Sequence, residues 1–117
     1  MLGNVYICGM KLAIIGSRTA PFIDMTPYIE GVDCVISGGA RGVDTMAADW
    51  AKEHGIRVVE FLPDYKRFGK GAPLRRNDEI VKACDAVLAF WDGKSRGTLY
   101  TINAAKKAGK PVRICYF

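Results

Sequence analysis

The amino-acid sequence predicts an α/β fold with a doubly wound, mainly parallel five-stranded sheet and helices on both faces. Five short β-rich runs alternate with helical patterns, and strands that alternate with helices pair in parallel through right-handed crossovers. The runs are aliphatic along almost their whole length, which is typical of strands covered on both faces. We expect the strand order 3-2-1-4-5. The predicted strands are Lys11–Ile15, Asp33–Ser37, Arg57–Phe61, Asp85–Phe90 and Pro111–Cys115.

The connections between these runs predict three helices. Apolar residues recur at helical spacing from Val43 to Ala51, and Gly55 is placed to end that helix. The other two helices are expected over residues 73–84 and 98–109. Their predicted inward residues are Leu74, Ile80, Val81, Cys84, Leu99, Ile102 and Ala105.

Two further connections do not give a clear helical pattern. Residues 21–29 include Pro27, which predicts a short or broken helix. Residues 63–73 are long for a strand-to-helix loop, and we expect this segment to act as a lid.

Length and composition fit one domain. The chain has 117 residues, half of them apolar, and 17 basic against 12 acidic residues give a net charge of +5. We expect this domain over residues 10–117, after an N-terminal extension of residues 1–9, in which Asn4–Cys8 fits either an extra edge strand or an ordered tail.

Several classes of protein are excluded by the same composition. No apolar run approaches the roughly 18–20 residues that span a bilayer, and residues 1–10 make a poor secretory signal. Four scattered cysteines without a Cys-x-x-Cys, together with a single histidine, make a metal site improbable. We therefore expect a reduced cytoplasmic protein without membrane contact, metal or resident cofactor.

Three glycine-bearing loops follow predicted strands and precede helical patterns. They are residues 16–19, 37–44 and 91–98. Ligands of open parallel sheets bind beyond the carboxyl ends of the strands, and backbone N–H groups at helix starts favour anions. Residues 16–20, 37–44, 62–76 and 91–98 hold nine basic and three acidic residues, a balance of +6 against +5 for the whole chain. The positive charge therefore gathers on one predicted rim, as an anionic ligand requires.

Familiar catalytic and phosphate motifs are absent. The glycines fit neither G-x-G-x-x-G nor G-x-x-x-x-G-K-[ST], and Glu60 is only a loose candidate for a ribose contact. The single His54 is placed at a helix end, so no Ser-His-Asp or Cys-His pair is predicted.

The sequence resembles the SLOG superfamily, a Rossmann-like group, and within it the stand-alone YspA-related branch. The residues that carry the resemblance are Ile15–Arg18, Ser37–Asp44, Arg76-Asn77 and Gly97-Thr98. The resemblance implies a nucleotide pocket at the carboxyl edge of the sheet. Two related families imply different activities: DNA-processing protein A binds single-stranded DNA, and the LOG enzymes cleave the base from nucleoside monophosphates. The LOG signature has a glutamate where this chain has Thr101.

We predict ligand contacts and no catalytic residue. Arg18, Arg41 and Arg76 would supply charge to a phosphate, and Trp91 would cover the base. The predicted ligand-binding residues are Gly16, Ser17, Arg18, Thr19, Ser37, Gly38, Gly39, Ala40, Arg41, Gly42, Asp44, Arg76, Asn77, Trp91, Ser95, Arg96, Gly97 and Thr98.

Structural roles remain open for some of these residues. Asp44 and Thr98 also suit helix capping, and Arg18 or Arg41 could form ion pairs within the protein. Trp91 could simply pack.

The first functional hypothesis is binding of a nucleotide or phosphorylated nucleoside derivative, as a sensor or carrier. The alternatives are LOG-like hydrolysis of nucleoside monophosphates and binding of single-stranded DNA or RNA. The resemblance also implies a homodimer.

Overall fold

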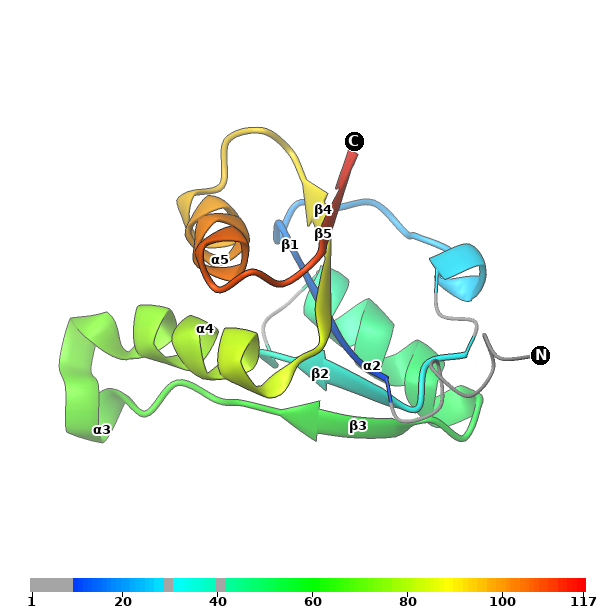
Figure 1. Cartoon of the computed structure of the whole chain (residues 1–117), viewed down its shortest axis with the longest axis horizontal. Helices are drawn as coiled ribbons and strands as arrows, with labels where there is room; N and C mark the ends of the chain where they lie inside the picture. Colours follow the sequence, from blue (N-terminus) through cyan, green and yellow to red (C-terminus); the bar gives the residue numbers. More distant parts are fainter. Residues whose placement is uncertain (1–9, 29–30, 40–41) are drawn as a thin grey trace.

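The fold is a five-stranded parallel sheet in the order β3-β2-β1-β4-β5, as the sequence predicts (Figure 1). The computed structural model describes residues 10–28, 31–39 and 42–117, so the segment Asn4–Cys8 lies outside the described residues. The strands are β1 (Lys11–Gly16), β2 (Cys34–Ser37), β3 (Arg57–Glu60), β4 (Ala86–Trp91) and β5 (Val112–Tyr116). The helices are η1 (Thr26–Tyr28), α2 (Val43–Glu53), α3 (Tyr65–Phe68), η2 (Gly69–Gly71), α4 (Ala72–Ala83) and α5 (Arg96–Lys107).

Helices cover both faces of the sheet, with α2 on one side and α4 and α5 on the other (Figure 1). Side chains of β1 point alternately to the two faces, because successive residues of a strand face opposite sides. Ile14 packs with Val43 of α2, whereas Ile15 packs with Ile80 of α4. The continuous aliphatic run of β1 thus serves two separate cores.

The edge strand β3 departs from this pattern. Three of its four residues are exposed, and Val59 shows 36% of its surface. The expectation that the strands are covered on both faces is therefore wrong for β3, which lies at an edge of the sheet that the described residues form.

Two leucines predicted to face the core are exposed instead. Leu74 is 43% exposed and Leu99 is 38% exposed. Helix α5 begins two residues earlier than expected, and its buried positions are Thr98, Thr101, Ile102 and Ala105. Threonines therefore hold the inward positions of the first turns of α5, and Leu99 turns outward.

The predicted lid is largely helical. Asp64 caps α3 by accepting the backbone N–H of Arg67 at 3.1 Å, and η2 then leads directly into α4. The predicted broken helix near Pro27 corresponds to η1, a single 3₁₀ turn. Within the described residues, every helix is too short or too polar to cross a membrane.

Candidate functional site

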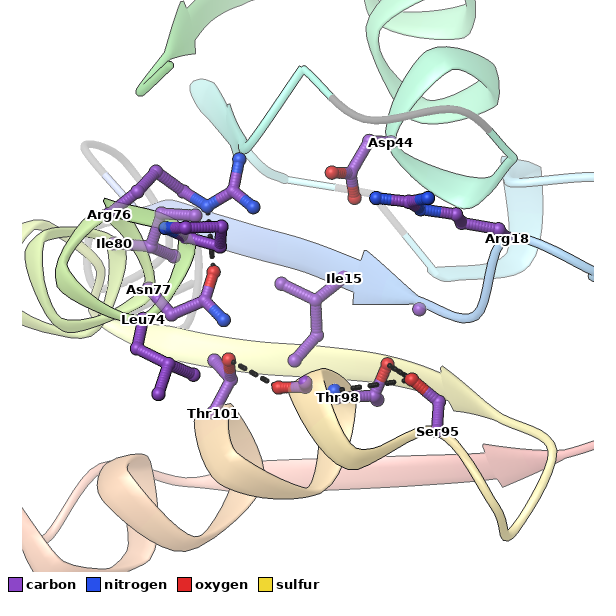
Figure 2. A pocket seen from close by; sticks show the side chains of 13 residues that line it. Ile15, Arg18, Asp44, Leu74, Arg76, Asn77, Ile80, Ser95, Thr98 and Thr101 are labelled. Atoms are coloured by element: carbon purple, nitrogen blue, oxygen red, sulfur yellow. Dashed lines mark hydrogen bonds between the residues drawn. The ribbon is translucent and has the colours of Figure 1, made fainter. Parts of the chain in front are cut away.

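A cavity of about 310 Å³ opens at the carboxyl edge of the sheet, beside the ends of β1 and β4 (Figure 2). The strand order reverses here, since β2 and β3 lie on one side of β1 and β4 and β5 on the other. Such a switch point is the usual ligand site of open α/β sheets. The lining residues are Ile15, Gly16, Arg18, Asp44, Pro73, Leu74, Arg76, Asn77, Ile80, Ser95, Gly97, Thr98 and Thr101.

The structure brings eight of the predicted ligand residues into this lining. They are Gly16, Arg18, Asp44, Arg76, Asn77, Ser95, Gly97 and Thr98. Eight other predicted residues are described but do not line the cavity: Ser17, Thr19, Ser37, Gly38, Gly39, Gly42, Trp91 and Arg96. Ala40 and Arg41 lie outside the described residues.

The prediction missed the apolar wall. Ile15, Leu74 and Ile80 line the cavity together with Pro73 and Thr101. The available signal was the position of Leu74, six residues before the buried Ile80 of α4 and two residues before the predicted Arg76.

The N-terminus of α5 lies at the cavity, since Ser95, Gly97 and Thr98 line it. Ser95 caps the helix, since its Oγ accepts the Thr98 N–H at 3.4 Å and lies 3.1 Å from Thr98 Oγ1. Within the described part of the chain, the N–H groups of Arg96 and Gly97 have no hydrogen-bond partner. The first turn of α5 contains no acidic residue, and the carboxylate just before it, Asp92, accepts the N–H groups of Ser95 and Lys94 and not those of Arg96 and Gly97. These features favour an anion at this helix start.

Gly97 differs from Gly16, the other glycine that lines the cavity, because no contact within the described part of the chain requires a glycine there. A Cβ placed on Gly97 would meet no atom of the described residues within 4 Å. By contrast, a Cβ on Gly16 would lie 2.6 Å from the Phe90 carbonyl oxygen and 2.6 Å from Val43 Cγ2. The close packing of α2 on β1 therefore explains Gly16, whereas the glycine at Gly97 is suited to close approach by a bound group.

The glycines of the loop after β2 are likewise explained by contacts within the protein. Gly39 and Gly42 have φ values of 70° and 80°, which favour glycine. A Cβ on Gly42 would lie 2.9 Å from the Arg18 carbonyl oxygen, and one on Gly38 would lie 2.7 Å from Arg76 Nη1. Their predicted contact with phosphate stays a prediction.

Asp92 joins the loop after β1 to the loop after β4. Its Oδ1 accepts the N–H groups of Lys94 and Ser95, both at 2.8 Å, and these bonds hold the pKa of the Asp92 carboxyl below its usual value. The Asp92 N–H donates to Ser17 Oγ at 3.2 Å, and the Thr19 hydroxyl donates to Asp92 Oδ2 at 3.4 Å. Ser17 and Thr19, both predicted as phosphate contacts, therefore hold the two loops in place.

Arg76 connects α4 by hydrogen bonds to the residues that follow β2 and β3. Its Nη1 donates to the carbonyls of Gly38 and Phe61, the latter at 3.5 Å, and its Nε donates to Asn77 Oδ1 at 2.7 Å. The Nη2 group has no hydrogen-bond partner among the residues that the structure describes. Arg76 can thus keep its structural contacts and still offer charge to the cavity.

The mouth of the cavity carries Arg18 and Asp44. Arg18 is exposed, and Figure 2 shows its side chain reaching toward the space that Asp44 faces. Asp44 is only 7% exposed and lies in the first turn of α2. The first turns of α4 and α5 contain no acidic residue. The two arginines and one carboxylate of the lining leave it with a net positive charge.

Two side chains discussed for catalysis or stacking have partners within the protein. Thr101 is 2% exposed, and its Oγ1 donates to the Gly97 carbonyl at 3.1 Å. Trp91 Nε1 donates to the Ser95 carbonyl at 3.0 Å, and its ring lies 5.7 Å from that of Tyr116. Neither arrangement needs a ligand.

Fold and site together define an open, parallel α/β domain with a basic pocket at its topological switch point. The model of the YspA, cpYpsA-related SLOG family matches residues 28–68. The chain is 43% identical over 84 residues to the Gene 61 protein of Mycobacterium phage D29, an alignment that covers 67% of each protein. This chain belongs to the YspA-related SLOG family.

A solved structure supports the same fold. DNA processing protein A (DprA) from Streptococcus pneumoniae matches with a TM-score of 0.75 and 20% sequence identity over 90% of this chain. The chain spans 50% of the length of that structure. Membership of the SLOG family supports a role in binding nucleotides or nucleic acids in general.

Proposed function

We propose that this protein binds a nucleotide or phosphorylated nucleoside derivative in the cavity between β1, α4 and α5. The observation that carries the proposal is the start of α5. The N–H groups of Arg96 and Gly97, which have no partner among the described residues, and the open space over Gly97 coincide in one turn. A phosphate seated there would accept those N–H groups.

The surrounding charge supports the same placement of the phosphate. Arg18 and Arg76 line the cavity, and a guanidinium forms strong charge-assisted bonds with phosphate. The Asp92 bridge fixes the loops after β1 and β4, so the binding groups are already in position before a ligand arrives.

The rest of the cavity suits a compact apolar group. Ile15, Leu74 and Ile80 supply an aliphatic wall against which a base could lie. A volume of about 310 Å³ is at the small end for ligand pockets, which favours a mononucleotide over a dinucleotide.

Native mass spectrometry of the freshly purified protein tests the proposal. We expect an added mass that corresponds to a phosphate-bearing compound and disappears after the protein is unfolded and refolded. A ligand-free spectrum, together with no binding across a panel of nucleoside mono- and diphosphates, would contradict the proposal.

Hydrolysis of the glycosidic bond has less support. LOG-like chemistry needs a carboxylate to stabilise positive charge at the sugar, and Thr101 stands at the corresponding position. Asp44 is the one acidic residue among the described lining. We expect no free base after incubation with nucleoside monophosphates; its release by the wild-type protein, but not by Asp44→Asn, would establish hydrolysis.

Binding of single-stranded nucleic acid is a second candidate, because the similar solved structure is that of a DNA processing protein. Residues 62–76, the segment that contains the cavity residue Arg76, hold five basic residues that could contact a phosphate backbone. An oligonucleotide would release many counterions, so its affinity would fall steeply with salt. A mononucleotide that binds as tightly as an oligonucleotide, with weak salt dependence, would count against this candidate.

A further inference from the structure

A second group of arginines lies beside the pocket, on α3 and α4. There a separate cavity of about 240 Å³ is lined by Arg67, Arg75 and Arg76, among others. Arg76 also lines the first cavity, so the two spaces meet at its side chain. Nothing in the proposed binding of one phosphate accounts for the other two arginines.

Arg67 and Arg75 share one aromatic ring. Their Cζ atoms lie 5.1 Å and 4.6 Å from the ring centroid of Phe68. Throughout the described ranges, neither guanidinium has a carboxylate within hydrogen-bond or ion-pair distance. Two like charges held on one ring repel each other, and an anion between them would relieve that repulsion.

The acidic residues nearby do not pair with the guanidinium groups of Arg67 and Arg75. Asp64 accepts the backbone N–H of Arg67 at 3.1 Å and so serves as the cap of α3. Asp64 and Glu79 both line the cavity with exposed side chains, so the three arginines of the lining outnumber its two carboxylates. Residues 62–79 contain five basic and three acidic residues, which leaves the segment at +2. The local charge therefore favours an anion over a cation.

We propose that Arg67, Arg75 and Arg76 form a second phosphate-binding site, continuous with the first, so that the ligand carries two phosphate groups. The inference rests on the proposed function for the first phosphate. A free nucleoside bisphosphate and a short single strand of nucleic acid share this chemistry. Guanidinium groups suit it because they bind phosphate oxygens in pairs.

A site-resolved titration tests the proposal. ¹H–¹⁵N correlation spectra of the full chain would be recorded with a nucleoside 5′-monophosphate, a nucleoside 3′,5′-bisphosphate and a tetranucleotide, with sulfate at equal ionic strength as the control. We expect the monophosphate to shift the amides of residues 96–98 and the bisphosphate to shift residues 67–75 as well. The bisphosphate should bind about tenfold more tightly, as expected for one added charge-assisted contact.

The variant Arg75→Ala should remove this tenfold advantage and leave monophosphate binding within about twofold. Arg113→Ala is the matched control, since Arg113 is exposed and its Cζ lies 5.0 Å from the Tyr28 ring, yet it lines neither cavity. Both variants should keep the melting temperature of the wild type, because exposed substitutions of this kind have small effects.

The possible results separate the two proposals. Shifts confined to residues 96–98 with both nucleotides would overturn the second site and leave the proposed function standing. No saturable shift in either region would overturn both. Shifts confined to residues 67–75 would also overturn both, because the first phosphate would then have no site. Given shifts in both regions, a tetranucleotide that binds more tightly than the bisphosphate identifies nucleic acid as the source, and equal affinity identifies the free nucleotide.

Discussion

At the scale of single residues, two glycines with similar sequence contexts have opposite roles. Gly16 leaves room for Val43 and for the Phe90 carbonyl, whereas Gly97 faces open space at the start of α5. Glycine in a helix costs stability relative to alanine. The protein therefore carries at Gly97 a cost that internal packing does not explain.

Substitution of these glycines should change stability in opposite directions. Gly97→Ala should raise the free energy of unfolding by about 0.5 kcal/mol, since it gains helix propensity without a clash. Gly16→Ala should lower it by about 1–3 kcal/mol through overpacking. Urea unfolding of both variants checks the prediction; a destabilised Gly97→Ala would show that this glycine has a structural role.

Arg18 and Arg76 also differ in how much each side chain contributes to the stability of the fold. Arg76→Ala should cost about 1–3 kcal/mol, because it removes the donor to the Gly38 and Phe61 carbonyls. Arg18→Ala should stay within about 0.5 kcal/mol of the wild type, because Arg18 is exposed. Calorimetric binding measurements should show weaker nucleotide binding for both. An Arg18→Ala variant with unchanged affinity would remove Arg18 from the site.

The Asp92 carboxyl predicts a dependence of stability on pH. Its pKa is lowered in the folded protein by the Ser95 and Lys94 N–H groups, against about 3.9 in an unfolded chain. A lowered folded pKa adds stability above pH about 4, and this contribution is lost as the pH falls through the folded pKa. Between pH 5 and pH 3, the wild type should lose more unfolding free energy than Asp92→Asn. Equal losses would show that the Asp92 bonds are too weak to matter.

At the scale of helices and strands, the position at which α5 begins determines where the proposed phosphate site lies. Ser95 caps this helix, so the start lies two residues before the position predicted from Thr98. The sequence analysis considered Thr98 as the cap, whereas in the structure Ser95 is the cap and Asp92 accepts its N–H.

Removal of this cap should weaken the helix. Ser95→Ala should lower the free energy of unfolding by about 1 kcal/mol, the usual effect of losing an N-cap hydroxyl. Ser95→Asp, which keeps an acceptor, should restore stability but place a negative charge where the phosphate is proposed. Chemical unfolding and nucleotide titration of the pair separate the two effects; equal affinity for Ser95→Asp and wild type would argue against a phosphate at this turn.

Helical periodicity could identify the helices but could not separate residues that face the core from residues that face a pocket. Leu74 has the spacing of a core residue, yet it lines the cavity and is 43% exposed. Segment 62–71 gave no helical signal, because α3 and η2 are single turns that depend on the Asp64 cap and on packing against α4. Such short elements have too few residues to show a period.

At the scale of the whole molecule, the order of the strands brings the residues of the site together. The strand order was predictable because alternating strands and helices leave few parallel arrangements, and that order brings the loops after β1 and β4 together. Eight of the eighteen predicted ligand residues line one cavity, although those from the loops after β1 and β4 are about 75 positions apart from one another in the chain. What the sequence could not reveal is which loop glycines are needed for internal packing, since that depends on contacts between distant segments.

Calorimetric titration of a nucleoside 5′-monophosphate into the wild type and Gly97→Ala tests the central claim most directly. The account predicts saturable one-to-one binding to the wild type and affinity at least about tenfold weaker for the variant, because its methyl group occupies the position of the phosphate. Equal affinity for the two proteins, both correctly folded, would contradict a phosphate site at the start of α5.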